Sequence, residues 1–145
     1  YDNVRVGING RLDTIQAAVL LAKLPHYEDE ILKRQAVSEL YTKQLKSVLK
    51  PFIKAKRTSV WSQYTIRVQN RDKLQEKLKE QGIPTVVHYP IPLHLQECFQ
   101  YLNYKSGHFP VSERASEEVI SLPMNAFLHN DEIKYIAKNI NMITL

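Results

Sequence analysis

The sequence contains a single cysteine, Cys98, among its 145 residues. One thiol cannot form a disulfide within the chain, and it lacks the nearby cysteine partner that structural zinc sites need. The five histidines are not paired at helix spacing either. We therefore expect no metal site. A chain without disulfides is typical of a reducing compartment, and we expect a cytoplasmic protein.

Several other features are missing as well. No apolar run approaches the roughly 20 residues of a membrane span, and no basic start followed by an apolar run marks a signal peptide. The G-x-S-x-G motif of hydrolases and the P-loop of nucleotide-binding proteins do not occur. The chain begins at Tyr1 rather than Met. We expect no membrane partner, and we expect the natural N-terminus to lie upstream.

The composition is that of a folded domain. Hydrophobic residues make up 43% and charged residues 24% of the chain, which is typical of soluble globular proteins. The net charge of +5 suits anionic partners such as phosphates, nucleotides or nucleic acid.

The first half of the chain carries the periodicity of helices. Asp13 predicts the start of a helix whose apolar side chains recur at i, i+3, i+4 and i+7 from Ile15. Pro25 interrupts this pattern, and an apolar stripe over residues 27–49 predicts a long amphipathic helix.

The second half mixes strands with helices. Alternation over residues 60–68 predicts a strand, and a short helix follows from Asn70 to Gly82. Further patterns predict a helix over 112–120, a strand at "SLPMN" and a last helix capped by Asn130 or Asp131. We therefore predict an α+β fold, with long N-terminal helices and a small sheet that carries helices on one face.

Two stretches are candidates for ligand binding. In "GINGR", Asn9 and Arg11 stand beside a helix start, where main-chain N–H groups favour anions, and an arginine can hold a carboxylate with two bonds. In "HYPIPLH", prolines stiffen a loop that presents His88 and Tyr89 beyond a strand. From these residues alone, a plain loop with a surface arginine, and a locally packed His88 and Tyr89, remain open.

A third stretch, "SVWSQYTIRVQNR", could bind single-stranded nucleic acid through Trp61 and Tyr64. These rings differ in parity along the predicted strand, so we expect them on opposite faces. We expect no nucleic-acid partner.

Taken together, three segments resemble the DegT/DnrJ/StrS family of sugar aminotransferases, which use pyridoxal phosphate. They are "VGINGRLDTIQAAVLLAKL", "SVWSQYTIRVQNRDKLQEKLKEQGIPTVVHYPIPLH" and "FPVSERASEEVISLPMNAFL". The resemblance covers essentially the whole chain. It is strongest to the branch that aminates a UDP-3-keto-sugar acid, with glutamate as amino donor, for bacterial surface polysaccharides.

The resemblance implies a role for four residues. Asn9 matches an asparagine that reaches the cofactor phosphate of the other subunit in a homodimer with shared active sites. Arg11 matches the adjacent arginine, placed to bind the substrate carboxylate. His88 and Tyr89 match a loop pair that contacts the nucleotide sugar.

The resemblance also implies that the catalytic residues lie outside this chain. The family's Schiff-base lysine lies in a large N-terminal domain, and its motif has no match here, so we expect no catalytic residue in this chain and no activity from it alone. Residues 1–50 would form an inter-domain and dimer-interface segment with a long helix, and residues 51–145 the small C-terminal domain of a fold-type I enzyme. The alternatives are a non-catalytic interaction or dimerisation remnant of such an enzyme, and a basic nucleic-acid-binding α+β module.

Overall fold

A two-stranded antiparallel sheet forms the middle of the fold in the computed structural model, which describes residues 1–144. Strand β1 (Tyr64–Arg67) pairs with β2 (Val119–Leu122), with Tyr64 opposite Leu122 and Ile66 opposite Ile120. Single bridges widen the sheet on both sides, since Leu49 pairs with Arg67 and Val86 pairs with Ser121. The small sheet of the predicted α+β fold is confirmed.

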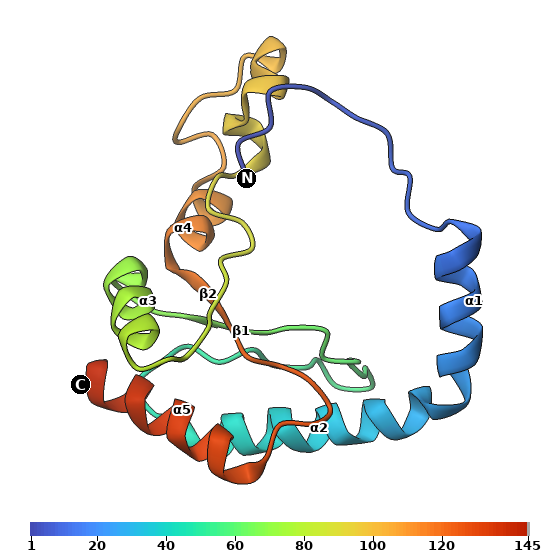
Figure 1. The fold of residues 1–145 in the computed structure, drawn as a ribbon. Helices are drawn as coiled ribbons and strands as arrows, with labels where there is room; N and C mark the ends of the chain where they lie inside the picture. Colours follow the sequence, from blue (N-terminus) through green and yellow to red (C-terminus); the bar gives the residue numbers. More distant parts are fainter. Residues whose placement is uncertain (145) are drawn as a thin grey trace.

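Most of the helices lie close to this sheet, and one stands apart from it (Figure 1). The α-helices are α1 (Thr14–Lys23), α2 (Tyr27–Gln44), α3 (Arg71–Glu80), α4 (Pro110–Glu118) and α5 (Asn130–Ile143). Three short 3-10 helices are η1 (Leu24–His26), η2 (Leu93–Leu95) and η3 (Glu97–Leu102). Helices α2 and α5 run side by side beneath the strands in Figure 1.

The core lies between the sheet and helices α2, α3 and α5. Each element contributes apolar side chains at its own spacing, because alternate strand residues and every third or fourth helix residue share a face. The fully buried members include Tyr41, Leu45, Tyr64, Ile66, Leu74, Leu78, Ile120, Ile133 and Ile140. Because Tyr41 and Leu45 belong to α2, the second half of that helix shares one core with the segment that follows residue 50.

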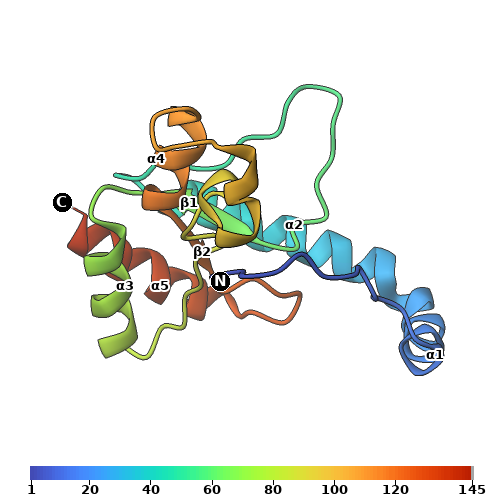
Figure 2. The same ribbon diagram turned by 90° about the horizontal axis from the view of Figure 1, so that it is seen from above.

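Helix α1 is the exception to this packing. Asp13 caps it as predicted, since its carboxylate accepts the Gln16 main-chain N–H at 2.8 Å. None of its residues is buried, and α1 stands away from the core in both Figure 1 and Figure 2. The apolar face that its periodicity predicts is present, but it contacts no core in the described part of the chain.

Both predicted strands have wrong bounds, since the strand predicted over 60–68 is Tyr64–Arg67 and the one at "SLPMN" is Val119–Leu122. Three predicted helix boundaries are wrong as well, and tertiary contacts explain two of them. The long helix ends at Gln44 rather than residue 49, because Leu49 leaves it to pair with Arg67. The helix predicted over 112–120 is Pro110–Glu118, since Val119 and Ile120 join the sheet. The last helix is capped by His129, whose main-chain N–H donates to the Glu132 carboxylate at 2.7 Å.

Residues 1–144 include no helix that combines the length and the apolar character of a membrane span.

Candidate functional site

The sheet positions the loop that carries His88 and Tyr89. Val86 exchanges two main-chain hydrogen bonds with Ser121 of β2, at 2.8 and 3.2 Å, and the Val87 side chain is buried. His88 and Tyr89 follow this anchor directly, so their place is set by the edge of the sheet. The two rings lie close together, with centroids 5.6 Å apart.

The ring of Tyr1 joins these two rings. The ring of Tyr1 lies edge-on to His88 at 6.1 Å and to Tyr89 at 5.3 Å between centroids. Sequence reasoning missed Tyr1, because 87 positions separate it from His88 and no local pattern links them. Three aromatic side chains from two distant segments therefore form one cluster.

Hydrogen bonds from Gln96 hold the same two segments together. Its side-chain Oε1 accepts the main-chain N–H of Asn3 at 2.8 Å, and its Nε2 donates to the carbonyl of Tyr1 at 3.0 Å and to that of Ile91 at 3.2 Å. The Cys98 main-chain N–H donates to the Asn3 carbonyl at 3.1 Å. Residues 1–3 are thus bound to the loop that continues from His88.

A pocket of about 500 Å³ opens at this junction. Its lining includes Asn3, His88, Tyr89, Ile91, Gln96 and Ser112. The Nδ1 atom of His88 is buried and has no hydrogen-bond partner within residues 1–144. Buried polar atoms nearly always have partners, so this nitrogen marks a place where a ligand or a further segment can complete the structure.

Asn9 and Arg11 do not lie in this pocket lining. Both are exposed, and neither side chain forms a hydrogen bond or ion pair among the described residues. Figure 2 shows the chain leaving the junction after its first residues and running toward α1. The structure therefore unites His88 and Tyr89 with Tyr1 and Asn3, and it leaves Asn9 and Arg11 on an extended, solvent-exposed segment.

An acidic side chain that sequence reasoning missed organises the neighbouring loop. The Glu113 carboxylate accepts the main-chain N–H of Gly107 at 2.8 Å and that of Phe109 at 3.0 Å, and His94 Nε2 lies 3.0 Å away. These bonds, the main-chain ones above all, lower the pKa of Glu113 below its ordinary value of 4.5. His94 thus pairs with Glu113 beside the loop and does not line the pocket.

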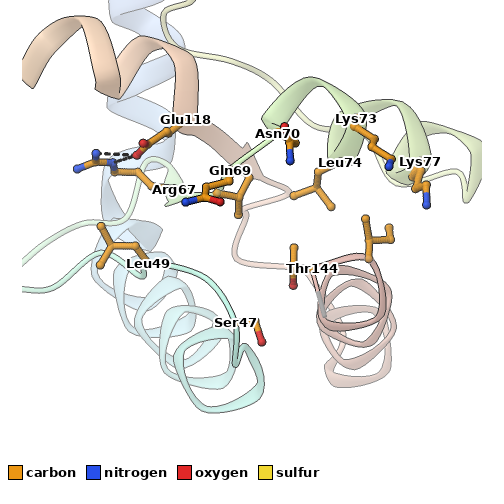
Figure 3. Close-up of a pocket in the computed structure, with 12 residues that line it drawn as sticks. Ser47, Leu49, Arg67, Gln69, Asn70, Lys73, Leu74, Lys77, Glu118 and Thr144 are labelled. Atoms are coloured by element: carbon orange, nitrogen blue, oxygen red, sulfur yellow. Dashed lines mark hydrogen bonds and ion pairs between the residues drawn. The ribbon is translucent and has the colours of Figure 1, made fainter. Parts of the chain in front are cut away.

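A second, polar pocket lies beside Arg67 at the end of β1 (Figure 3). Arg67 there is held by Glu118, with nitrogen–oxygen distances of 2.7 and 3.0 Å, while Lys73 and Lys77 line the wall formed by α3. Asn9, Arg11, His88 and Tyr89 are all absent from its lining. The candidate site is therefore the junction around His88.

The predicted placement of Trp61 and Tyr64 on opposite faces of one strand is wrong. Trp61 precedes β1 and has a φ of +48°, so strand parity does not apply to it. Both side chains are buried, and their ring centroids are 5.6 Å apart. These rings form part of the core and leave no exposed stacking surface at this position.

Within the described residues 1–144, no group of three His, Cys, Asp or Glu side chains is arranged to hold a metal ion.

Comparison with known proteins adds an independent finding. Residues 1–141 match the model of the DegT/DnrJ/EryC1/StrS aminotransferase family. The chain is 46% identical over 138 residues to UDP-2-acetamido-2-deoxy-3-oxo-D-glucuronate aminotransferase of Pseudomonas aeruginosa, an alignment that covers 94% of this chain and 38% of that protein. The chain thus spans less than half the length of this curated relative.

Solved structures share the fold. A DegT DnrJ EryC1 StrS aminotransferase from Brucella abortus superposes with a TM-score of 0.83 at 44% identity, over 99% of this chain and 39% of that one. DesV from S. venezuelae, solved in complex with a ketimine intermediate, superposes with a TM-score of 0.86 at 30% identity, over 95% of this chain and 38% of that one.

Proposed function

The chain belongs to the DegT/DnrJ/EryC1/StrS aminotransferase family, and from this membership we propose that it is the C-terminal portion of a pyridoxal phosphate-dependent nucleotide-sugar aminotransferase. The complete protein would transfer an amino group, with glutamate as donor, to a UDP-3-keto-sugar acid. The observation that carries this proposal is the 46% identity to a relative named for that substrate. The reaction would take place in the bacterial cytoplasm, and its product would serve the synthesis of surface polysaccharide.

In this proposal His88 and Tyr89 bind the nucleotide sugar. Their loop is fixed to the sheet through Val86, so the two side chains are held in place before a ligand arrives. The unpartnered Nδ1 of His88 supports the proposal, because it offers a hydrogen-bonding group inside the pocket wall. Tyr89 is 61% exposed and lines the same pocket.

Arg11 would bind the carboxylate of the sugar acid. Its guanidinium is unengaged among residues 1–144, so both of its donor edges are available for a paired interaction with a carboxylate. Such a pairing would distinguish an acidic sugar from its neutral counterpart. Arginine suits this task better than lysine, because its donors lie in one plane at the spacing of carboxylate oxygens.

Asn9 would hold the phosphate of pyridoxal phosphate in the partner subunit. An exposed side-chain amide without an internal partner fits a phosphate oxygen, to which it can donate. The cofactor supplies the electron sink for amino transfer. This chain contributes binding and orientation, and we propose that the lysine that attaches the cofactor lies in the remainder of the protein.

Helix α1 supports the proposal of a homodimer with shared sites. Ile15 is 79% exposed and Val19 is 53% exposed on this helix, and apolar faces of this kind mark contacts with other protein surface. We propose that the exposed faces of residues 1–50 are covered by the remaining domain and by the second subunit. Asn9 and Arg11 would then extend from this segment into the shared site.

The proposal is tested on the complete reading frame that contains this chain. The protein is purified with pyridoxal phosphate, given glutamate and the UDP-3-keto-sugar acid, and the amino sugar is measured by mass spectrometry. The neutral UDP-3-keto-sugar is the matched substrate control. Turnover that prefers the acid is the expected result. A complete protein that binds the cofactor and aminates neither sugar would contradict the proposal and favour a non-catalytic relative.

A further inference from the structure

The strongest unassigned feature is the buried amide of Gln96. The side chain is 2% exposed, and it forms the three hydrogen bonds described above, to Asn3, Tyr1 and Ile91. A buried amide needs its bonds to be complete, because an unpaired buried donor or acceptor is costly. Gln96 meets that need with partners from two segments that are more than 80 positions apart in the sequence.

All three partners of Gln96 are main-chain groups. The amide therefore fixes the backbone of residues 1–3 whatever side chains stand there, as a neighbouring strand would. The N–H of Cys98, in the η3 helix that follows Gln96, adds a main-chain bond to Asn3. The two segments have no strand pairing between them, so these bonds supply the directional contacts at the junction.

The geometry has a consequence for the pocket. Fixing the Tyr1 carbonyl places the Tyr1 ring against His88 and Tyr89. Asn3 and Gln96 line the same pocket as that ring pair. The segment that leads to Asn9 and Arg11 also starts from this fixed point.

We propose that Gln96 is a positioning residue of the nucleotide-sugar site: it binds residues 1–3 to the loop that carries His88 and Tyr89. The proposal rests on the proposed function, since it takes this pocket to be the substrate site. Gln96 acts through Tyr1 and Asn3 and needs no contact with the reacting atoms.

The test uses the Gln96→Glu variant of the complete protein. A carboxylate can still accept the Asn3 N–H, but it cannot donate to the carbonyls of Tyr1 and Ile91. Protonation returns one O–H donor, so the defect should lessen as the pH falls. Gln100→Glu is the matched control, because Gln100 is exposed and its side chain makes no hydrogen bond within residues 1–144.

Two readouts are taken. Hydrogen exchange at the Asn3 and Cys98 amides should quicken by about tenfold in Gln96→Glu above neutral pH, and less in acid. The KM for the keto-sugar should rise by about tenfold, while kcat and the KM for glutamate stay within roughly twofold. Gln100→Glu should match the wild type in both.

Unchanged exchange at Asn3 and Cys98 would overturn the proposal, as would an equal effect in Gln100→Glu. A fall in kcat together with equal rises in both KM values would assign Gln96 a merely structural role. Asn3→Pro removes the main-chain N–H that donates to Gln96, and residue 3 is exposed. This second variant keeps the proposal testable if Gln96→Glu does not fold. A wild-type protein without aminotransferase activity would refute the proposed function, and the exchange readout would still decide whether Gln96 joins the segments.

Discussion

Two isoleucines in different environments give the sharpest test of how this chain is packed. Ile140 on α5 has no exposed surface, whereas Ile15 on α1 is 79% exposed. Ile→Ala at each position removes the same atoms from a helix. Any difference between the two variants therefore reports burial rather than residue chemistry.

The structure sets the size of the expected effects. Removing a fully buried isoleucine side chain costs about 2–5 kcal/mol, because the transfer free energy is lost and a cavity remains. For a chain of this size, that loss lowers the melting temperature by roughly 10 °C. At an exposed helix position, Ile→Ala changes the free energy of unfolding by less than about 0.5 kcal/mol.

Thermal unfolding of the 145-residue chain, followed by circular dichroism, measures both variants. Two protein concentrations are needed, because self-association would cover α1 and make the melting temperature concentration-dependent. The same Ile15→Ala change in the complete protein should be costly if α1 is covered there. A dilute chain that loses as much stability from Ile15→Ala as from Ile140→Ala would refute the described position of α1.

Four further outcomes follow from the site and its surroundings. Arg11→Ala in the complete protein should lower kcat/KM for the acidic keto-sugar by about 10- to 100-fold, because charge-assisted hydrogen bonds are lost, and should leave the neutral sugar nearly unaffected; equal losses would remove the carboxylate role. Asn9→Ala should weaken retention of pyridoxal phosphate during dialysis by roughly tenfold, measured by cofactor absorbance; unchanged retention would count against the phosphate contact. Because the pKa of Glu113 is lowered, the stabilising contribution of its carboxylate is present above the ordinary pKa of 4.5 and is lost as the pH falls through the lowered pKa. Glu113→Gln should therefore be less stable than the wild type at neutral pH. Urea unfolding should also show that this variant loses less stability in acid. Burial raises the pKa of Tyr64 above its ordinary 10.0. The stability that comes from keeping this phenol neutral is present below pH 10 and is lost as the pH rises through the raised pKa. Tyr64→Phe should therefore lose less stability at alkaline pH, measured by unfolding and by phenolate absorbance.

The sequence predicted elements well where local rules decide the structure. Asp13 caps its helix, and Tyr64 and Ile66 alternate with half-buried neighbours as a strand requires. Prediction from the sequence failed where a residue distant in the chain determines the local structure. Leu49 fits a helical stripe, but Arg67 offers it main-chain hydrogen bonds at 2.9 and 3.1 Å, and the sheet prevails over the helix pattern.

The site divides in the same way. His88 and Tyr89 were candidates because prolines follow them and a predicted strand precedes them, but the pattern alone left local packing open, and their proposed role came from the family resemblance. Tyr1, Gln96 and Glu113 could not be identified, because each acts through main-chain groups or rings whose positions depend on the tertiary fold. Main-chain partners leave no residue pattern, since every residue type other than proline offers the same N–H and C=O groups.

Three features of this chain have no protein partner among the described residues. His88 Nδ1 is buried without a partner in residues 1–144, Arg11 is a cation without a counter-ion there, and α1 carries apolar side chains in solvent. A buried nitrogen without a partner and an exposed apolar face are features that proteins rarely keep without a use, and a surface arginine without a counter-ion is free to bind an anion. Burial of α1 by more protein would bring Asn9 and Arg11 out of bulk water, where an anion becomes their best partner because charge interactions strengthen as solvent is excluded. The same assembly would therefore cover the apolar helix and create the anion site, and Gln96 would join that site to the His88 pocket.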